Sequence, residues 1–578
     1  MKKKLVYLFL TLALVVSCGD EFAETPAVGA IPPEAFQQAD GINLLLNAAY
    51  SVLDGVRANS PGNEFGVGVD NWWMDFIADD AHKGSTDGDQ VEAFQLETND
   101  RQTANGYIRA KFAALYAGVN RANAVLSAIA ASEDPASLTS QTAEARFLRG
   151  HFYFELIKVW GNISVISVEN FDNKEFSQPN VEGSAVTSPT DSPAWAQVEA
   201  DFQYAIDNLP SVRADQSDPG RPTAFVARAY LGKTHLYQGE WSDALTQLQQ
   251  VINSGEFALS PEYLDNFTVG GENGPESVFA VQFGVDAALS PNGNVGGKLN
   301  YPGGGPFSSC CGFYQPTIDL ANAFQVDGDG LPLLDTYNQS DFANDYGINS
   351  SEAFTPDTTS PVDPRLDYTV GRRGIDYNGF GEHIGKDWIR ANFADISGPY
   401  LPKKNVYQAS EIGSAQGTGA WGQQHSGMNY NIIRYADVLL MAAEAAVETD
   451  DLGTALTYVN LVRDRAANMT VVQAVDGSGP AANYQVGLYT SFGDQDFARN
   501  AVRFERRIEL GMEGQRLFDL TRWGTAQAVL TDYYANETRT ITNFGPKVAP
   551  YQAHFDLLPI PVTSIDLSGG VLIQNPSY

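Results

Sequence analysis

The sequence predicts a mainly α-helical protein, in which helical hairpins form a scaffold and a loop-rich, irregular subdomain is inserted between two of them. Residues 221–255 show two amphipathic helical patterns separated by a short break, and residues 434–466 repeat the same spacing. Between them, from residue 256 to 430, Gly, Pro, Asn and Asp interrupt short apolar runs. Because one hairpin cannot bury its own apolar face, we expect further hairpins to stack on these two.

The hairpin at 221–255 has the clearest pattern. The small residues Gly232 and Ala244 allow two antiparallel helices to approach closely, and Gly239 lies at the break between them. These spacings resemble those of a tetratricopeptide repeat, although His235 stands where that repeat usually has Tyr. The segment therefore predicts a repeat-type hairpin at the centre of the chain.

Further helices are predicted on both sides of the insertion from apolar residues at three- and four-residue intervals. The C-terminal tail, residues 557–578, reads as extended and loop-like. Inside the insertion, the run Ser277–Val285 is β-like. The predicted helical segments outside the central hairpin are 41–56, 106–131, 143–161, 189–209, 434–466 and 502–524.

The N-terminus predicts export and a lipid anchor. Three lysines at positions 2–4 precede about a dozen apolar residues, too few for a stable transmembrane helix. Cys18 follows directly, as in a bacterial lipobox, and the acidic residues after it resemble a signal that sends lipoproteins to the cell surface. We expect a signal peptide at 1–17 and a lipid-anchored tether at 18–40, with several acyl chains on Cys18 holding the protein to the outer membrane. An ordinary secretory leader with a chance cysteine is the alternative.

Charge and cysteine content exclude several classes of protein. The formal net charge of −34 opposes binding to nucleic acid and to anionic lipid through the protein body. Besides Cys18, the only cysteines are Cys310 and Cys311, so there is no disulfide framework and no zinc spacing. The adjacent pair allows a vicinal disulfide, but two buried or reduced thiols are the favoured interpretation.

Several segments, in this order and spacing, resemble the SusD/RagB family of outer-membrane lipoproteins, and the resemblance extends over essentially the whole chain. It implies four tetratricopeptide-like helix pairs plus a variable subdomain that supplies much of the ligand site. It also implies non-catalytic binding of glycan, or of peptide in some members, as a lid over a SusC-like TonB-dependent transporter, with no cofactor. The expected parts are 41–255 (N-terminal helical), 256–433 (variable) and 434–578 (C-terminal helical). The segments that carry the resemblance are 143–161, 221–255, 312–332, 363–369, 431–446, 506–524 and 557–578.

The candidate ligand residues are aromatic and polar side chains in loop-like segments. Aromatic rings stack on the apolar faces of sugars, while neighbouring carboxylates and amides bind hydroxyl groups. For each aromatic residue core packing is the alternative, and for the charged residues the alternative is a solvated helix end. We expect ligand contacts from Trp72, Trp73, Asp75, Asp80, Lys83, Tyr301, Phe313, Tyr314 and Trp421.

Other functions remain open at this stage. A peptide-binding lid of the RagB kind fits the same fold, whereas an intracellular repeat adaptor conflicts with the leader. A surface glycoside hydrolase would need two suitably placed carboxylates. Glu505, Glu509 and Glu513 share a helix face with arginines, which favours ion pairs over catalysis. The i,i+3 spacing predicts ion pairs of Glu513 with Arg516 and of Asp519 with Arg522. We expect no catalytic residue. We also expect no metal, because the calcium-like run from Asp327 has Asn338 where a calcium loop has Glu, and we interpret the run as a turn.

Overall fold

The computed structural model describes residues 36–55, 61–173, 186–213, 218–285, 293–307, 310–404, 406–419, 422 and 424–578. The predicted signal peptide, Cys18, the first part of the tether and Trp421 lie outside these residues. Within them the mainly α-helical prediction is confirmed. A search of the described helices finds none with the length and apolar character that crossing a membrane requires.

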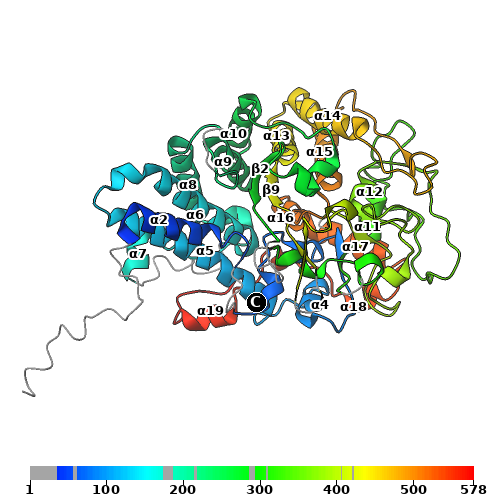
Figure 1. Ribbon diagram of the computed structural model, residues 1–578, viewed down its shortest axis with the longest axis horizontal. Helices are drawn as coiled ribbons and strands as arrows, with labels where there is room; N and C mark the ends of the chain where they lie inside the picture. The colour runs from blue at the N-terminus through cyan, green and yellow to red at the C-terminus, as the bar shows by residue number, and fades with distance from the viewer. Residues whose placement is uncertain are drawn as a thin grey trace, which may run out of the picture.

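Long helices form an arc across the molecule, from α2, α5, α6 and α8 through α9 and α10 to α13, α14 and α15 (Figure 1). Successive members pack on one another, as stacked hairpins require. These helices and the two that follow them are α2 (Ala39–Tyr50), α5 (Gly106–Ala130), α6 (Thr139–Trp160), α8 (Trp195–Asn208), α9 (Ala224–Gln238), α10 (Trp241–Ser254), α13 (Tyr435–Glu448), α14 (Leu452–Asn468), α15 (Gln495–Leu510), α16 (Arg516–Arg522) and α17 (Ala526–Glu537).

The central hairpin forms as its sequence predicts. The Thr223 side chain accepts a hydrogen bond from the backbone N–H of Val226 and starts α9, and Gly239 ends it with φ of +75°. A Cβ on Gly232 would lie 2.7 Å from Cγ of Leu248 on α10. The glycine therefore sets the close approach of the two helices.

Short elements fill the space between the arc and the loops. The shorter helices are α3 (Trp72–Asp75), α4 (Val91–Glu97), α7 (Val168–Asn173), α11 (Ile318–Ala323), α12 (Leu366–Thr369), α18 (Phe544–Lys547) and α19 (Val562–Leu567). The strands are β1 (Ala81–Gly84), β2 (Ser277–Val281), β3 (Phe313–Pro316), β4 (Pro361–Val362), β5 (Val370–Gly371), β6 (Leu401–Pro402), β7 (Gln416–Thr418), β8 (Gln424–Ser426), β9 (Tyr430–Arg434) and β10 (Asn483–Tyr484).

Two antiparallel strand pairs fix the loop-rich part to the scaffold. Strand β2 pairs with β9, which leads directly into α13, and the two lie at the centre of the molecule (Figure 1). Strand β1 pairs with β3, with Gly84 opposite Phe313. Most of the described loop-rich part shares the large core of the scaffold, while a smaller apolar cluster around Tyr301, Phe307 and Trp388 belongs to the loops alone.

The structure corrects three expectations. Helix α17 was not predicted, because its buried stripe contains Glu537, a charged residue that hides the apolar pattern. The tail is not wholly extended, since α19 forms within it. Cys310 and Cys311 are joined in a disulfide rather than present as two thiols.

Candidate functional site

The predicted ligand residues in the described part lie in the interior. Trp72 and Trp73 are both 0% exposed. Their indole N–H groups donate to the carbonyls of Phe65 at 3.1 Å and Gly66 at 3.0 Å. Buried Trp residues normally satisfy their N–H in this way, so the core-packing alternative describes both positions.

The other described candidates are also buried, and Asp75, Asp80 and Lys83 have polar partners within the protein, although Asp75 Oδ1 and the Tyr301 hydroxyl have no hydrogen-bond partner among the described residues. Tyr314 donates its hydroxyl to Asp75 at 2.5 Å, and Asp80 pairs with Arg507 at 3.0 Å. Lys83 donates to three backbone carbonyls that close its own loop. No solvated helix end is formed here, and Tyr301 and Phe313 likewise pack in apolar clusters.

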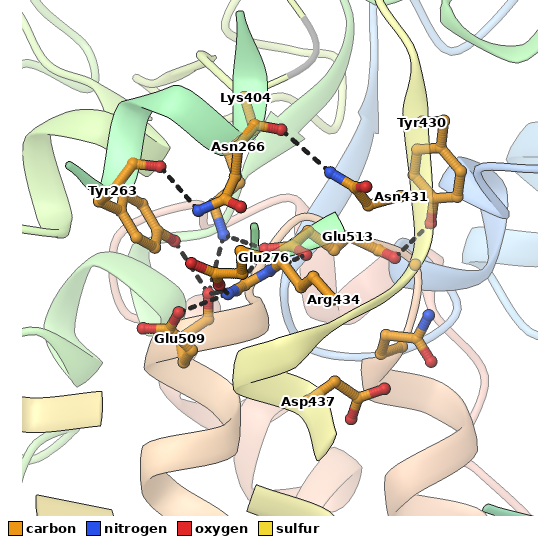
Figure 2. A network of polar contacts seen from close by, with 12 residues as sticks. Tyr263, Asn266, Glu276, Lys404, Tyr430, Asn431, Arg434, Asp437, Glu509 and Glu513 are labelled. Atoms are coloured by element: carbon orange, nitrogen blue, oxygen red, sulfur yellow. Dashed lines mark hydrogen bonds and ion pairs between the residues drawn. The ribbon is translucent and has the colours of Figure 1, made fainter. Parts of the chain in front are cut away.

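A buried ion network joins the loop-rich part to the C-terminal helices. Arg434, at the end of β9, contacts Glu276, Glu509 and Glu513, and Lys404 contacts Glu513 at 2.7 Å (Figure 2). Buried charges of this kind are tolerated only when paired and hydrogen-bonded. The network thus builds a rigid floor from segments far apart in the sequence.

The ion network keeps Glu509, on α15, in its ionised form. Burial alone raises the pKa of Glu509, but the charges of Arg465, Arg434 and Arg365 outweigh it and hold the pKa well below its usual range. A general acid in glycoside hydrolysis needs a protonated carboxyl group, and Glu509 is held ionised. The expected i,i+3 pair of Asp519 with Arg522 is confirmed at 2.8 Å.

The predicted i,i+3 pair of Glu513 with Arg516 is wrong. Glu513 pairs with Arg434 and Lys404, as described above, while Arg516 pairs with Asp79 at 2.7 Å. The reason is the turn after α15, which separates Glu513 from the helix that begins at Arg516. Residues on different elements do not keep helical spacing.

A small polar hollow, which we call the amide hollow, lies above this floor. Figure 2 shows Lys404, Asn266 and Asn431 approaching one another over the Arg434 network. The volume of the hollow is about 30 Å³, roughly the share of one water molecule in the liquid. Its wall includes Asn266, Phe267, Asn294, Lys404, Asn429 and Asn431.

The chemistry of the amide hollow suits hydroxyl groups. Asn431 donates its Nδ2 to the carbonyl of Asn266 at 3.3 Å, but its Oδ1 is buried without a hydrogen-bond partner. An unsatisfied buried acceptor is costly and calls for a donor. The half-buried ring of Phe267 lies beside it, packed edge-on against Tyr263. An aromatic face next to an unpaired amide oxygen is an arrangement that a sugar ring can use.

Burial also changes the pKa of Lys404 in the wall of the amide hollow. Desolvation lowers the pKa of Lys404 to about 8, although the Glu513 carboxylate opposes the shift. Sequence reasoning missed these wall residues. The one available signal was the polar run 429–431, because an Asn on either side of Tyr430 is unusual next to a buried strand.

Two groups of described residues could be considered as metal sites: the run from Asp327 and the cluster of Glu199, His235 and Glu240. Asp327 Oδ1 accepts hydrogen bonds from the N–H groups of Asp329 and Leu331, both at 2.9 Å, so this run is a turn as predicted. Glu199, His235 and Glu240 bring three potential ligand atoms within 4.8 Å. His235 and Glu240 already satisfy each other at 2.6 Å, so no ion is needed to explain the group.

Comparison with known proteins identifies the family. The profile of the SusD family matches residues 275–578, more than half of the chain, and a second profile, described as starch-binding and associating with the outer membrane, matches residues 63–236. The chain belongs to the SusD family. A SusD-like protein of Formosa agariphila, P2, is 26% identical over the full length of both chains. A SusD-like protein of Bacteroides ovatus is 24% identical over 100% of this chain and 92% of its own.

Solved structures of SusD-like proteins share the fold. A SusD-like carbohydrate-binding protein of Bacteroides fragilis superposes with a TM-score of 0.66 at 22% identity, covering 92% of this chain and 98% of its own. Surface glycan-binding protein A of Bacteroides thetaiotaomicron, solved in complex with laminarihexaose, gives a TM-score of 0.63 at 19% identity, covering 93% and 99%. These SusD-like neighbours confirm the predicted architecture.

Proposed function

We propose that this SusD-family protein is a non-catalytic, cell-surface lipoprotein that binds an oligosaccharide at the amide hollow and delivers it to a SusC-like TonB-dependent transporter. The observation that carries the proposal is the unpartnered Oδ1 of Asn431 beside the half-exposed ring of Phe267. Two structural neighbours support the ligand class, since one is described as laminarin-binding and the other holds laminarihexaose.

The size of the hollow indicates how a glycan would bind. A volume of about 30 Å³ holds a single hydroxyl or hydroxymethyl group and no whole ring. A sugar would therefore lie across the mouth, with one hydroxyl directed at Asn431 and its apolar face on Phe267. Residue 421 lies in the connection between β7 and β8, and we propose that Trp421 adds a second aromatic contact.

Affinity electrophoresis of the soluble form, residues 20–578, tests this function against laminarin and a panel of plant, algal and host polysaccharides. We expect retardation by at least one polymer without release of reducing ends. Asn431→Ala and Phe267→Ala should each weaken retention about tenfold, the equivalent of roughly 1.4 kcal/mol. The matched controls are Asn468→Ala and Phe393→Ala, which alter exposed residues of the same types.

Other outcomes would overturn the proposal in distinct ways. Release of reducing ends by the purified protein would establish a glycoside hydrolase. Retention of peptides and of no glycan would establish a peptide-binding lid. Unchanged retention in both site variants would remove the amide hollow as the site while leaving glycan binding intact.

The membrane anchor has its own test. Cys18→Ser removes the sulfur to which acyl chains would be attached, so the variant should leave the membrane fraction and appear in soluble fractions. Co-purification of the wild-type protein with a TonB-dependent transporter from detergent extracts tests the partner. A membrane-bound Cys18→Ser variant would contradict the lipid anchor.

A further inference from the structure

A second and larger hollow, which we call the tail hollow, lies where the C-terminal tail meets α16 and the segment at residues 187–188. Its volume is about 530 Å³, within the range of about 300–1,000 Å³ that is typical of small-molecule sites. It shares no wall residue with the amide hollow. The wall residues that matter here are Thr187, Trp523, His554, Asp556 and Asn575.

Asn575 supplies an unsatisfied acceptor in this wall. Its side chain is 2% exposed, and its Nδ2 donates to the carbonyls of Trp160 at 2.9 Å and Leu558 at 2.7 Å. Because both partners are acceptors, the orientation of the amide is fixed. Its Oδ1 is buried and has no hydrogen-bond partner. Such an atom is expected to accept from an O–H or N–H group that is absent from the structure.

The neighbouring Asp556 and His554 add further acceptors to this wall. Burial raises the pKa of Asp556 to about 6, and the Tyr551 hydroxyl donates to its Oδ1 at 3.0 Å. The described residues offer no hydrogen bond to its second oxygen. Burial also lowers the pKa of His554, so at neutral pH the imidazole is uncharged and offers one donor and one acceptor.

Arg522, the arginine in the wall, is already paired with carboxylates. Arg522 pairs with Glu444 at 2.6 Å and with Asp519 at 2.8 Å. The indole N–H of Trp523 donates to Glu444 at 2.7 Å. With Arg522 paired and a surplus of acceptors in the wall, the hollow favours a ligand rich in hydroxyl donors.

We propose that the tail hollow is a second ligand site, which takes a neutral, polyhydroxylated ligand of the size of one or two sugar units. A sugar hydroxyl donates to Asn575 Oδ1 and another to Asp556, while the indole of Trp523 forms an apolar wall. This site is separate from the amide hollow, and its occupation does not depend on glycan binding there.

Fluorine NMR of the protein labelled with 5-fluorotryptophan tests the site, because Trp523 is a built-in reporter among the eight tryptophans. Trp523→Phe assigns its signal. Glucose, galactose, mannose and xylose are each titrated to about 50 mM, since a small site with few hydrogen bonds binds in the millimolar range. We expect a saturable shift of the Trp523 signal with at least one sugar.

Thr187→Phe is the blocking variant, because Thr187 is exposed at the wall and its enlargement fills the hollow without disturbing the core. It should weaken the response at least tenfold, whereas Thr531→Phe, an exposed Thr on α17 outside the wall, should not. Asn431→Ala should leave the response intact even if glycan retention is lost.

Three results would overturn the proposal. The first is no shift of the Trp523 signal with any of the four sugars. The second is an equal shift in the Thr187→Phe variant, which would place binding elsewhere. The third is a shift with trialanine and with none of the sugars, which would make the hollow a peptide site.

Discussion

At the scale of single residues, Trp72 and Trp73 act as core anchors. Their rings pack edge-on against Tyr107, and Trp72 also contacts Phe313 and Tyr314 from the loop-rich part. Trp72→Ala should therefore destabilise the protein by roughly 3–5 kcal/mol. Denaturant unfolding measures this, with the half-buried Trp241→Ala on α10 as the milder control. If Trp72→Ala unfolds with the same free energy as the wild type but no longer retains glycan, Trp72 is a ligand contact and the core role is wrong.

The raised pKa of the buried His82 should make the free energy of unfolding depend on pH. Burial alone lowers the pKa of His82, but hydrogen bonds with Glu537 at 2.8 Å and Glu97 at 3.1 Å outweigh it and raise the pKa from 6.5 to about 9. A raised folded-state pKa stabilises the protein fully below pH 6.5, and this contribution is lost as the pH rises to 9.

The corresponding measurement is the unfolding free energy between pH 6 and 9.5. The wild-type protein should lose roughly 2–3 kcal/mol over this window relative to His82→Gln, because a pKa unit corresponds to about 1.4 kcal/mol. His235 is half-buried on the scaffold and pairs with the exposed Glu240 at 2.6 Å, and it provides the control variant His235→Gln. Parallel pH profiles of wild type and His82→Gln would contradict the assignment of a charged His82.

The burial of individual polar residues could not be predicted from the sequence. Asp75, Asp80 and Lys83 were expected to contact ligand because they lie in a polar segment next to two tryptophans. Their burial depends on partners far away in the chain: Tyr314 is 239 residues from Asp75, and Arg507 is 427 residues from Asp80. Local composition carries no information on such contacts. The part played by Trp421 stays a prediction.

At the scale of elements, the central hairpin depends on Gly232. Gly232→Ala would place a methyl group against Leu248, which is fully buried, and overpacking of this kind destabilises by roughly 1–3 kcal/mol. The matched control is Gly453→Ala on α14, where the added Cβ would meet only Asp451 Oδ1 at 3.8 Å. That variant should be neutral or slightly stabilising. Thermal unfolding compares the two, and equal midpoints would contradict the close-packing role of Gly232.

Elements were predictable where their apolar pattern was uninterrupted. The helices α5, α6, α9, α10, α13 and α14 follow from periodicity alone, because their buried faces are continuous. Helix α17 was missed since Glu537 occupies its buried stripe, where it accepts hydrogen bonds from the N–H groups of Ile318 and Asp319. The amide hollow was missed because its wall comes from separate loops that meet only in the fold.

At the scale of the whole molecule, the three predicted parts are interlocked. Arg507 of the C-terminal part pairs with Asp79 and Asp80 of the N-terminal part. Arg365 of the loop-rich part pairs with Glu505 and Glu509 at 2.7 Å. These pairs are buried, so separating the parts would expose uncompensated charges in each. We therefore expect the parts to be stable together and none of them to fold alone.

This arrangement predicts a single unfolding transition. Calorimetry of residues 20–578 should give one peak whose calorimetric and van't Hoff enthalpies agree, as in a cooperative unit. Arg507→Ala should lower the midpoint of the whole transition without splitting it, because it removes a buried partner worth roughly 3–5 kcal/mol. Arg539→Ala is the control, since Arg539 pairs with Asp341 at the surface and exposed pairs contribute only about 0–1 kcal/mol. Two resolved peaks, or a stable fragment 36–255, would instead show that the N-terminal helices form an independent domain.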